Sequence, residues 1–88
     1  MKFKRKVKIV NQRENNLDIA YFLDDEKHKD HFLNAIADAQ NFEDIFVTCR
    51  EYLKYGISGN VDRYGDYLKS HFYNTVGNKY FIYFFLED

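Results

Sequence analysis

Residues 79–86 read KYFIYFFL, and they contain the longest apolar run of the chain, Tyr80 to Leu86. Every residue after the lysine is apolar or aromatic, so a strand formed here is apolar on both faces. Such strands normally lie in the middle of a sheet or under cover, because neither face is suited to water. The run is far shorter than the roughly twenty apolar residues that cross a bilayer. We therefore expect a covered strand around which the rest of the chain is arranged.

A second strand is predicted at the start of the chain, where residues 2–9 alternate strictly. Phe3, Arg5, Val7 and Ile9 share one side, and Lys2, Lys4, Lys6 and Lys8 share the other. A period of two predicts a strand with one solvated face. The polar residues 11–16 then resemble a hairpin loop, and alternation over 17–23 predicts a further strand.

Three helices are expected between these strands and the last one. Asp24 and Asp25 are suited to cap a helix that runs to about Gln40, and Asn41 is suited to begin a second that stops at Gly56. Residues 45–48 also suit a strand, and local preference leaves residues 43–55 open between the two. A third helix is expected from Asp62 to Val76.

The expected fold class is therefore α+β, with one small compact domain over residues 1–88. The element order is ββαααβ, an antiparallel three-stranded sheet with helices packed on one face. If the last strand pairs beside the first, its rings join the four lysines on the face opposite the helices. That face would be both basic and aromatic.

Charge is distributed unevenly along the chain. The first thirteen residues hold six basic side chains and no acid, whereas residues 14–88 hold seven basic and fourteen acidic side chains, so a net charge of −7 underlies the overall −1. This polarity favours binding to charged partners and supplies no reaction chemistry.

Composition excludes several classes of protein. Cys49 is the only cysteine, which excludes a disulfide scaffold and favours a reducing cytoplasm. Residues 7–10 are too short for the apolar part of a signal peptide, so we expect a cytoplasmic protein without a membrane segment. His28 and His31 do not complete a recognisable zinc site, and no catalytic motif is present, so neither enzymatic activity nor a cofactor is expected.

The leading functional hypothesis concerns the acids and tyrosines of the body. Exposed rings and complementary charge are typical of protein interfaces. Small, proline-free chains rich in Asn, Lys, Tyr and Phe, with acidic bodies, are typical of AT-rich bacterial genomes and their phages or plasmids, which favours a compact inhibitor. We expect a stoichiometric inhibitor of a basic partner, such as a nuclease or CRISPR effector, which would make it an anti-CRISPR or anti-restriction protein. The expected partner-binding residues are Asp24, Asp25, Glu43, Asp44, Tyr52, Tyr55, Asp62, Tyr64 and Asp66.

Two further classes stay open. The basic first strand could bind single-stranded nucleic acid, with cations on phosphates and rings under bases, through Lys2, Lys4, Lys6, Lys8, Phe22 and Tyr83. Alternatively, the chain could be an immunity protein that neutralises a toxin, or a structural homo-oligomer with its aromatic face buried between copies. A monomer and a homodimer are both compatible with the sequence.

Overall fold

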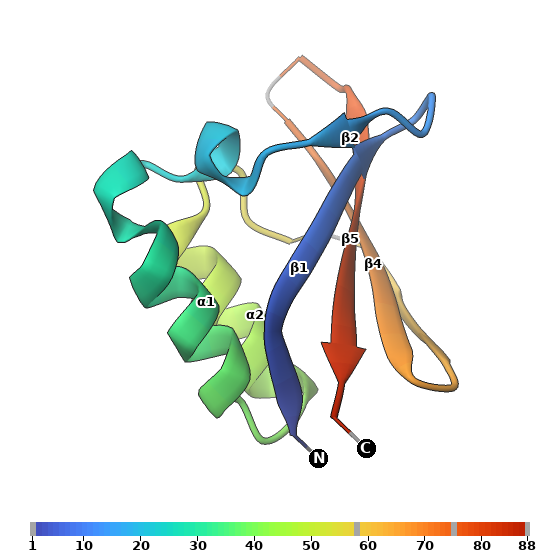
Figure 1. Cartoon of the computed structure of the whole chain (residues 1–88). Helices are drawn as coiled ribbons and strands as arrows, with labels where there is room; N and C mark the ends of the chain where they lie inside the picture. Colours follow the sequence, from blue (N-terminus) through green and yellow to red (C-terminus); the bar gives the residue numbers. More distant parts are fainter. Residues whose placement is uncertain (1, 58, 75, 88) are drawn as a thin grey trace.

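The structure, a computed structural model, describes residues 2–57, 59–74 and 76–87. Five strands form one antiparallel sheet in the order β2-β1-β5-β4-β3. They are β1 (Phe3–Asn11), β2 (Asn16–Leu17), β3 (Val61–Tyr64), β4 (Tyr67–Tyr73) and β5 (Lys79–Leu86). Helices α1 (Lys29–Asp38) and α2 (Phe42–Tyr52) lie side by side against one face of the sheet (Figure 1).

The expected three-stranded sheet with three helices is wrong, although the α+β class holds. Residues 61–73, where a third helix was expected, form the β3–β4 hairpin. Tyr64, Leu68 and Phe72 are spaced by four residues, which suits both a helix and a strand. The buried Ser70 between the last two completes the alternation of a strand, and Gly65 has a positive φ of 67° in the two-residue turn. Part of the expected helix, residue 75, lies outside the described residues.

The second predicted strand is also mostly wrong. It is reduced to β2, after which residues 19–22 form a 3-10 turn, η1. The Asp18 side chain accepts a hydrogen bond from the Ala20 N–H at 2.9 Å, and this local bond starts the turn in place of a sheet ladder. Tyr21 consequently points to solvent while Phe22 and Leu23 are buried.

A side-chain cap starts α2, and another starts the 3-10 turn that leads into α1. Asp25 accepts from the Lys27 N–H and begins η2 (Glu26–His28), which leads into α1. Asn41 accepts from the Asp44 N–H at 3.0 Å and begins α2. Residues 43–52 are therefore helical, and the strand alternative for that segment is wrong.

The core fills the space between the sheet and the helices. Phe22 lies near its centre and packs edge-to-face against Tyr55, Phe72 and Tyr80. Cys49 is also fully buried there, and burial raises the pKa of its thiol. In the part of the chain that the structure describes, no helix covers the opposite face of the sheet (Figure 1).

Candidate nucleic-acid interface

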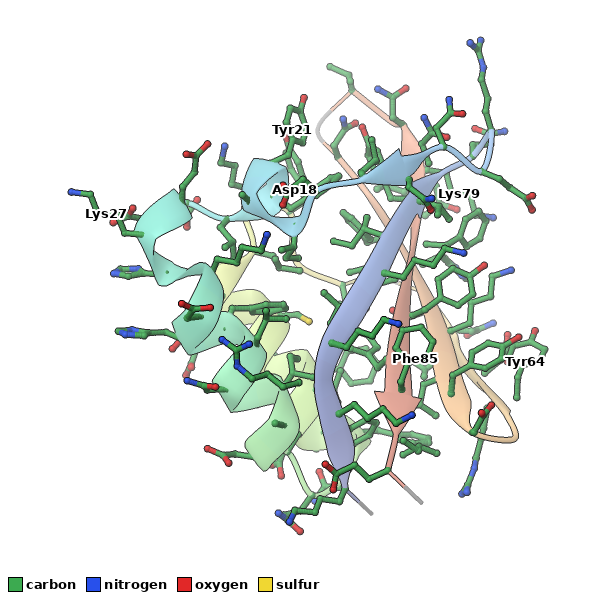
Figure 2. The ribbon with its side chains drawn as sticks, viewed as in Figure 1. Asp18, Tyr21, Lys27, Tyr64, Lys79 and Phe85 are labelled. Carbon is green, nitrogen blue, oxygen red and sulfur yellow. The ribbon has the colours of Figure 1, made fainter. Side chains whose placement is uncertain are left out.

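The uncovered side of the sheet carries rings and cations together, and we call it the open face. Side chains two residues apart along a strand point to the same side, so the register assigns its members. Its members are Lys8, Val10, Asp62, Tyr64, Tyr67, Lys69, His71, Tyr73, Lys79, Phe81, Tyr83 and Phe85, and Lys6 joins them through its contact with Phe85. Figure 2 shows Tyr64 and Lys79 on the side of the sheet away from α1 and α2.

The open face is built from cross-strand rows. In the middle row, Lys8 of β1 pairs with Tyr83 of β5, which pairs with Lys69 of β4. Rows on either side join Phe81 to His71 and Phe85 to Tyr67. The three β5 rings on this face, Phe81, Tyr83 and Phe85, thus form a line flanked on both sides by neighbouring strands.

Four lysines lie over these three rings. Lys69 Nζ is 4.5 Å from the centroid of Phe81 and 5.7 Å from that of Tyr83. Lys8 lies 5.5 Å from Tyr83, and the remaining two contacts are Lys6 over Phe85 at 5.1 Å and Lys79 over Phe81 at 5.3 Å. The open-face rings of β5 are half-buried beneath these ammonium groups. Each contact of this type is worth about 0.5–1 kcal/mol at an exposed site, so the lysines are held weakly.

The edge of the open face beyond β4 is aromatic but not basic. Tyr64 stacks on Tyr67 with centroids 5.4 Å apart and remains 47% exposed. Asp62 of β3 pairs in register with Lys69 and is the acid of this region. The positive charge is therefore concentrated over β1, β5 and β4.

The structure separates the six nucleic-acid-binding residues expected from the sequence. Lys6, Lys8 and Tyr83 lie together on the open face. Phe22 does not, because it is fully buried on the helical side. Lys2 and Lys4 are exposed at the start of the chain, and among the described residues neither lies over a ring.

Sequence reasoning missed the contribution of β4 to this face. Tyr67, Lys69, His71 and Tyr73 point to it because β4 is a strand, whereas a helix was expected there. The two-residue sequence Gly65-Asp66 between alternating segments is a hairpin signal that could have indicated the strand.

The nine acidic and tyrosine residues expected to bind a protein partner lie in three places. Asp24, Asp25, Tyr52 and Tyr55 gather where α2 ends, and the Asp24 N–H donates to the Tyr52 carbonyl at 3.4 Å. Glu43 and Asp44 lie in the first turn of α2, roughly 13 Å away along the helix axis. Asp62, Tyr64 and Asp66 lie on β3 and its turn.

Capping accounts for two of these acids. The Asp44 carboxylate accepts from the Gln40 N–H at 2.8 Å while its own N–H donates to Asn41, so it completes the start of α2. Asp25 accepts from the Lys27 N–H and caps the start of η2 in the same way. These two side chains therefore have structural roles that need no partner.

The histidines near the start of α1 stack on each other. The rings of His28 and His31 have centroids 5.6 Å apart, and His28 Nε2 lies 3.8 Å from the Asp25 carboxylate. Across residues 2–57, 59–74 and 76–87, no group of three or more potential metal ligands is found. Over the same residues, no helix is long and apolar enough to cross a membrane.

Comparisons with protein-family models, curated proteins and solved structures find no match to this chain. A function is therefore inferred from the residues of the open face and their geometry.

Proposed function

We propose that the chain binds single-stranded nucleic acid on the open face. The observation that carries this proposal is the set of five contacts between four lysines and three rings on one uncovered sheet surface. Proteins that hold single strands without strong sequence preference combine cations for the phosphates with rings on which bases stack.

The energetics favour exchanging a lysine for a base. Stacking of a base on an aromatic side chain contributes about 1–3 kcal/mol, more than the lysine contact that it displaces. The displaced ammonium group stays beside the ring and becomes available to a phosphate. Both parts of the nucleotide then gain a partner in one step.

The spacing of the rings favours a single strand over a duplex. Phe81, Tyr83 and Phe85 are two residues apart, which places successive rings about 7 Å apart along β5. This is roughly twice the 3.4 Å rise per nucleotide along a strand of B-DNA. A strand must therefore be extended to place one base on each ring, and the bases of a duplex cannot separate in this way.

A second copy of the chain fits this face less well. Most oligomers of identical chains are symmetric, and a two-fold interface would bring the same surface of each copy together. The four lysines of one copy would then face those of the other, and like charges across an interface oppose association. A polyanion has the complementary charge.

The test is fluorescence anisotropy with a labelled twelve-residue oligothymidylate and a labelled duplex of equal length. We expect the single strand to bind more tightly, and replacing Tyr83 by Leu to weaken binding by about fivefold or more, since one stack is lost. Tyr21→Leu is the matched control, because this exposed ring lies in η1, outside the open face. Equal weakening by both variants, or tighter duplex binding, would contradict the proposal.

A protein-binding function is a second candidate at the end of α2. The hydrogen bond between Asp24 and Tyr52 brings one acid and one tyrosine of the expected set together, and Tyr21 is 63% exposed in the preceding 3-10 turn. This smaller surface suits a basic protein, and we propose it as the place where the chain would bind a partner if it acts as an inhibitor. Replacing Asp24 by Lys, which leaves the Asp25 cap of η2 intact, should weaken capture of a basic protein partner from a nuclease-treated lysate, and unchanged capture would reject this surface.

A further inference from the structure

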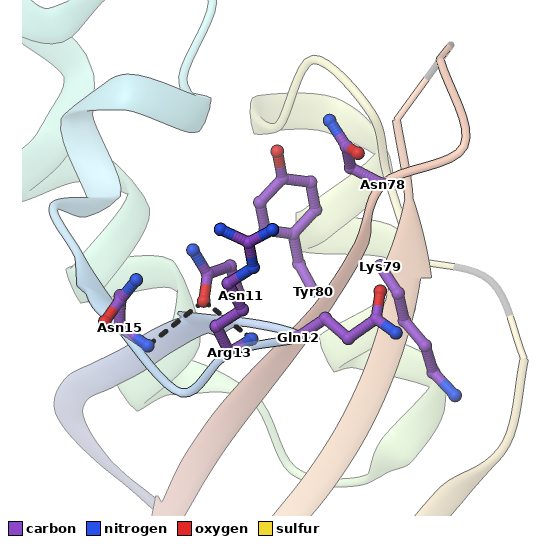
Figure 3. Close-up of a pocket in the computed structure, with 7 residues that line it drawn as sticks. All are labelled: Asn11, Gln12, Arg13, Asn15, Asn78, Lys79 and Tyr80. Atoms are coloured by element: carbon purple, nitrogen blue, oxygen red, sulfur yellow. Dashed lines mark hydrogen bonds between the residues drawn. The ribbon is translucent and has the colours of Figure 1, made fainter.

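A pocket of about 540 Å³ opens at the end of the open face (Figure 3). It lies between the β1–β2 turn and the start of β5, and its walls are Asn11, Gln12, Arg13, Asn15, Asn78, Lys79 and Tyr80. Pockets that hold small organic ligands measure about 300–1,000 Å³, so this one has room for more than a simple ion.

The walls of the pocket present mainly hydrogen-bond donors. Arg13 brings five N–H groups and Lys79 three, and none of the described residues that line the pocket carries a carboxylate. The neighbouring acid in the turn, Glu14, is not part of the lining. The pocket is therefore suited to a ligand that is rich in acceptors.

Two of the oxygen acceptors in the walls are already engaged. Asn11 Oδ1 accepts from the backbone N–H groups of Arg13 at 2.9 Å and Asn15 at 3.0 Å, which Figure 3 marks with dashed lines. The Tyr80 hydroxyl accepts from Asn74 Nδ2 at 3.2 Å, which leaves its own hydrogen free to donate. These bonds increase the excess of donors over acceptors.

We propose that this pocket binds one guanine nucleotide at the end of the bound strand. Guanine presents two adjacent acceptors, O6 and N7, and arginine pairs with both at once. Adenine offers an acceptor beside a donor on the same edge, and cytosine offers a donor, so both match a donor-rich pocket less well. The phosphate of the nucleotide adds further acceptors for Lys79.

The position of Lys79 connects the pocket to the line of rings. Its side chain lines the pocket, and its ammonium group lies 5.3 Å from the centroid of Phe81, the first open-face ring of β5. A strand whose bases stack along β5 would therefore place its next nucleotide at the pocket. This inference rests on the proposed function for the direction of the strand, whereas the pocket itself is testable with a free nucleotide.

The test is a titration of the ¹⁵N-labelled full chain with guanosine monophosphate, adenosine monophosphate and inorganic phosphate, followed by NMR. We expect amide shifts confined to residues 11–15 and 78–80, with the guanine nucleotide bound at least about fivefold more tightly than the adenine nucleotide. Arg13→Gln should remove that difference, and Lys27→Gln, which removes an exposed cation on the helical side, should retain it.

Equal binding of the two nucleotides would overturn the inference, and so would phosphate alone binding as tightly as guanosine monophosphate. Absence of shifts at the pocket, with oligothymidylate still bound on the open face, would reject the pocket while the proposed function stands. Shifts at the pocket without any oligonucleotide binding would reject the proposed function and retain the nucleotide site.

Discussion

The salt dependence of binding should report how many of the four open-face lysines meet a phosphate. For a single strand, the logarithm of the binding constant falls with the logarithm of salt concentration with a slope of about −0.7 per neutralised phosphate. If Lys6, Lys8, Lys69 and Lys79 each meet one phosphate, the slope is about −2.8. Affinity for oligothymidylate should then fall about fifty-fold between 50 and 200 mM salt.

Lys69→Gln removes the cation that lies over two rings while preserving most of the side chain. The slope should change to about −2.1, so that the same increase in salt weakens binding only about twentyfold. Lys27→Gln is the matched control, because it removes the same charge from an exposed position in η2. Its slope should equal that of the unchanged protein.

The assay is fluorescence anisotropy at five salt concentrations between 50 and 200 mM, with circular dichroism to show that both variants are folded. A slope for the Lys69 variant that equals that of the unchanged protein would refute the assignment of Lys69 to a phosphate. An equal change of slope in the Lys27 variant would refute the open face as the binding surface.

Three further predictions concern stability. Ser70 Oγ is buried without a hydrogen-bond partner among the described residues. Ser70→Ala should therefore stabilise the fold by about 1 kcal/mol in urea unfolding, because it removes an unsatisfied hydroxyl. A loss of stability would show that the hydroxyl is satisfied. Gly59 has a φ of 90°, and a Cβ added there would clash with His71 Nε2, whereas Gly56 has a φ of 69° and open space around it. Gly56→Ala should cost about 1–2 kcal/mol and Gly59→Ala should cost more; equal losses would mean that His71 moves freely aside. Hydrogen bonds from the Ala20 N–H and from Lys29, together with the charge of Lys29, lower the pKa of Asp18. The stability that Asp18 contributes to the fold is therefore present above the pKa of the unfolded chain and is lost as pH falls through the pKa of the folded protein. The stability difference between the unchanged protein and Asp18→Ala should shrink below about pH 4, and a constant difference would contradict this.

The two long strands beside each other in the sheet were predictable because their patterns admit one interpretation. Residues 3–9 alternate cleanly, and Phe3 and Ile9 are buried as that alternation requires. KYFIYFFL was expected in the middle of a sheet, and β5 lies between β1 and β4. The basic and aromatic face followed from that pairing.

The hairpin formed by β3 and β4 was missed because its apolar residues satisfy two periods at once. A spacing of four residues between Leu68 and Phe72 places them on one face of a helix and also on one face of a strand. The Gly65-Asp66 turn and the pairing of β4 with β3 and β5 decide between them. This error concealed Lys69 and His71, which complete the open face.

The acidic residues show a different limit of sequence reasoning. An acidic residue near a helix start gives the same sequence pattern whether its carboxylate caps the helix or is free to bind a partner protein. Asp44 is occupied by the Gln40 N–H, and Asp18 by the Ala20 N–H and Lys29. Such bonds depend on the backbone path, so a count of acids overestimates the surface available for docking.

The overall charge of −1 is compatible with binding a polyanion because many of the acids lie on the helical side of the sheet. Asp38 and Glu51, for example, are exposed on α1 and α2, on the far side of the sheet from Lys8 and Lys69. The Debye length is about 8 Å at physiological ionic strength, so a phosphate at the open face responds mainly to the charges nearest to it. These are the four lysines, with Asp62 beside Lys69. The uneven distribution of charge also orients the protein as it meets nucleic acid, because the helical side repels the phosphates that the open face attracts.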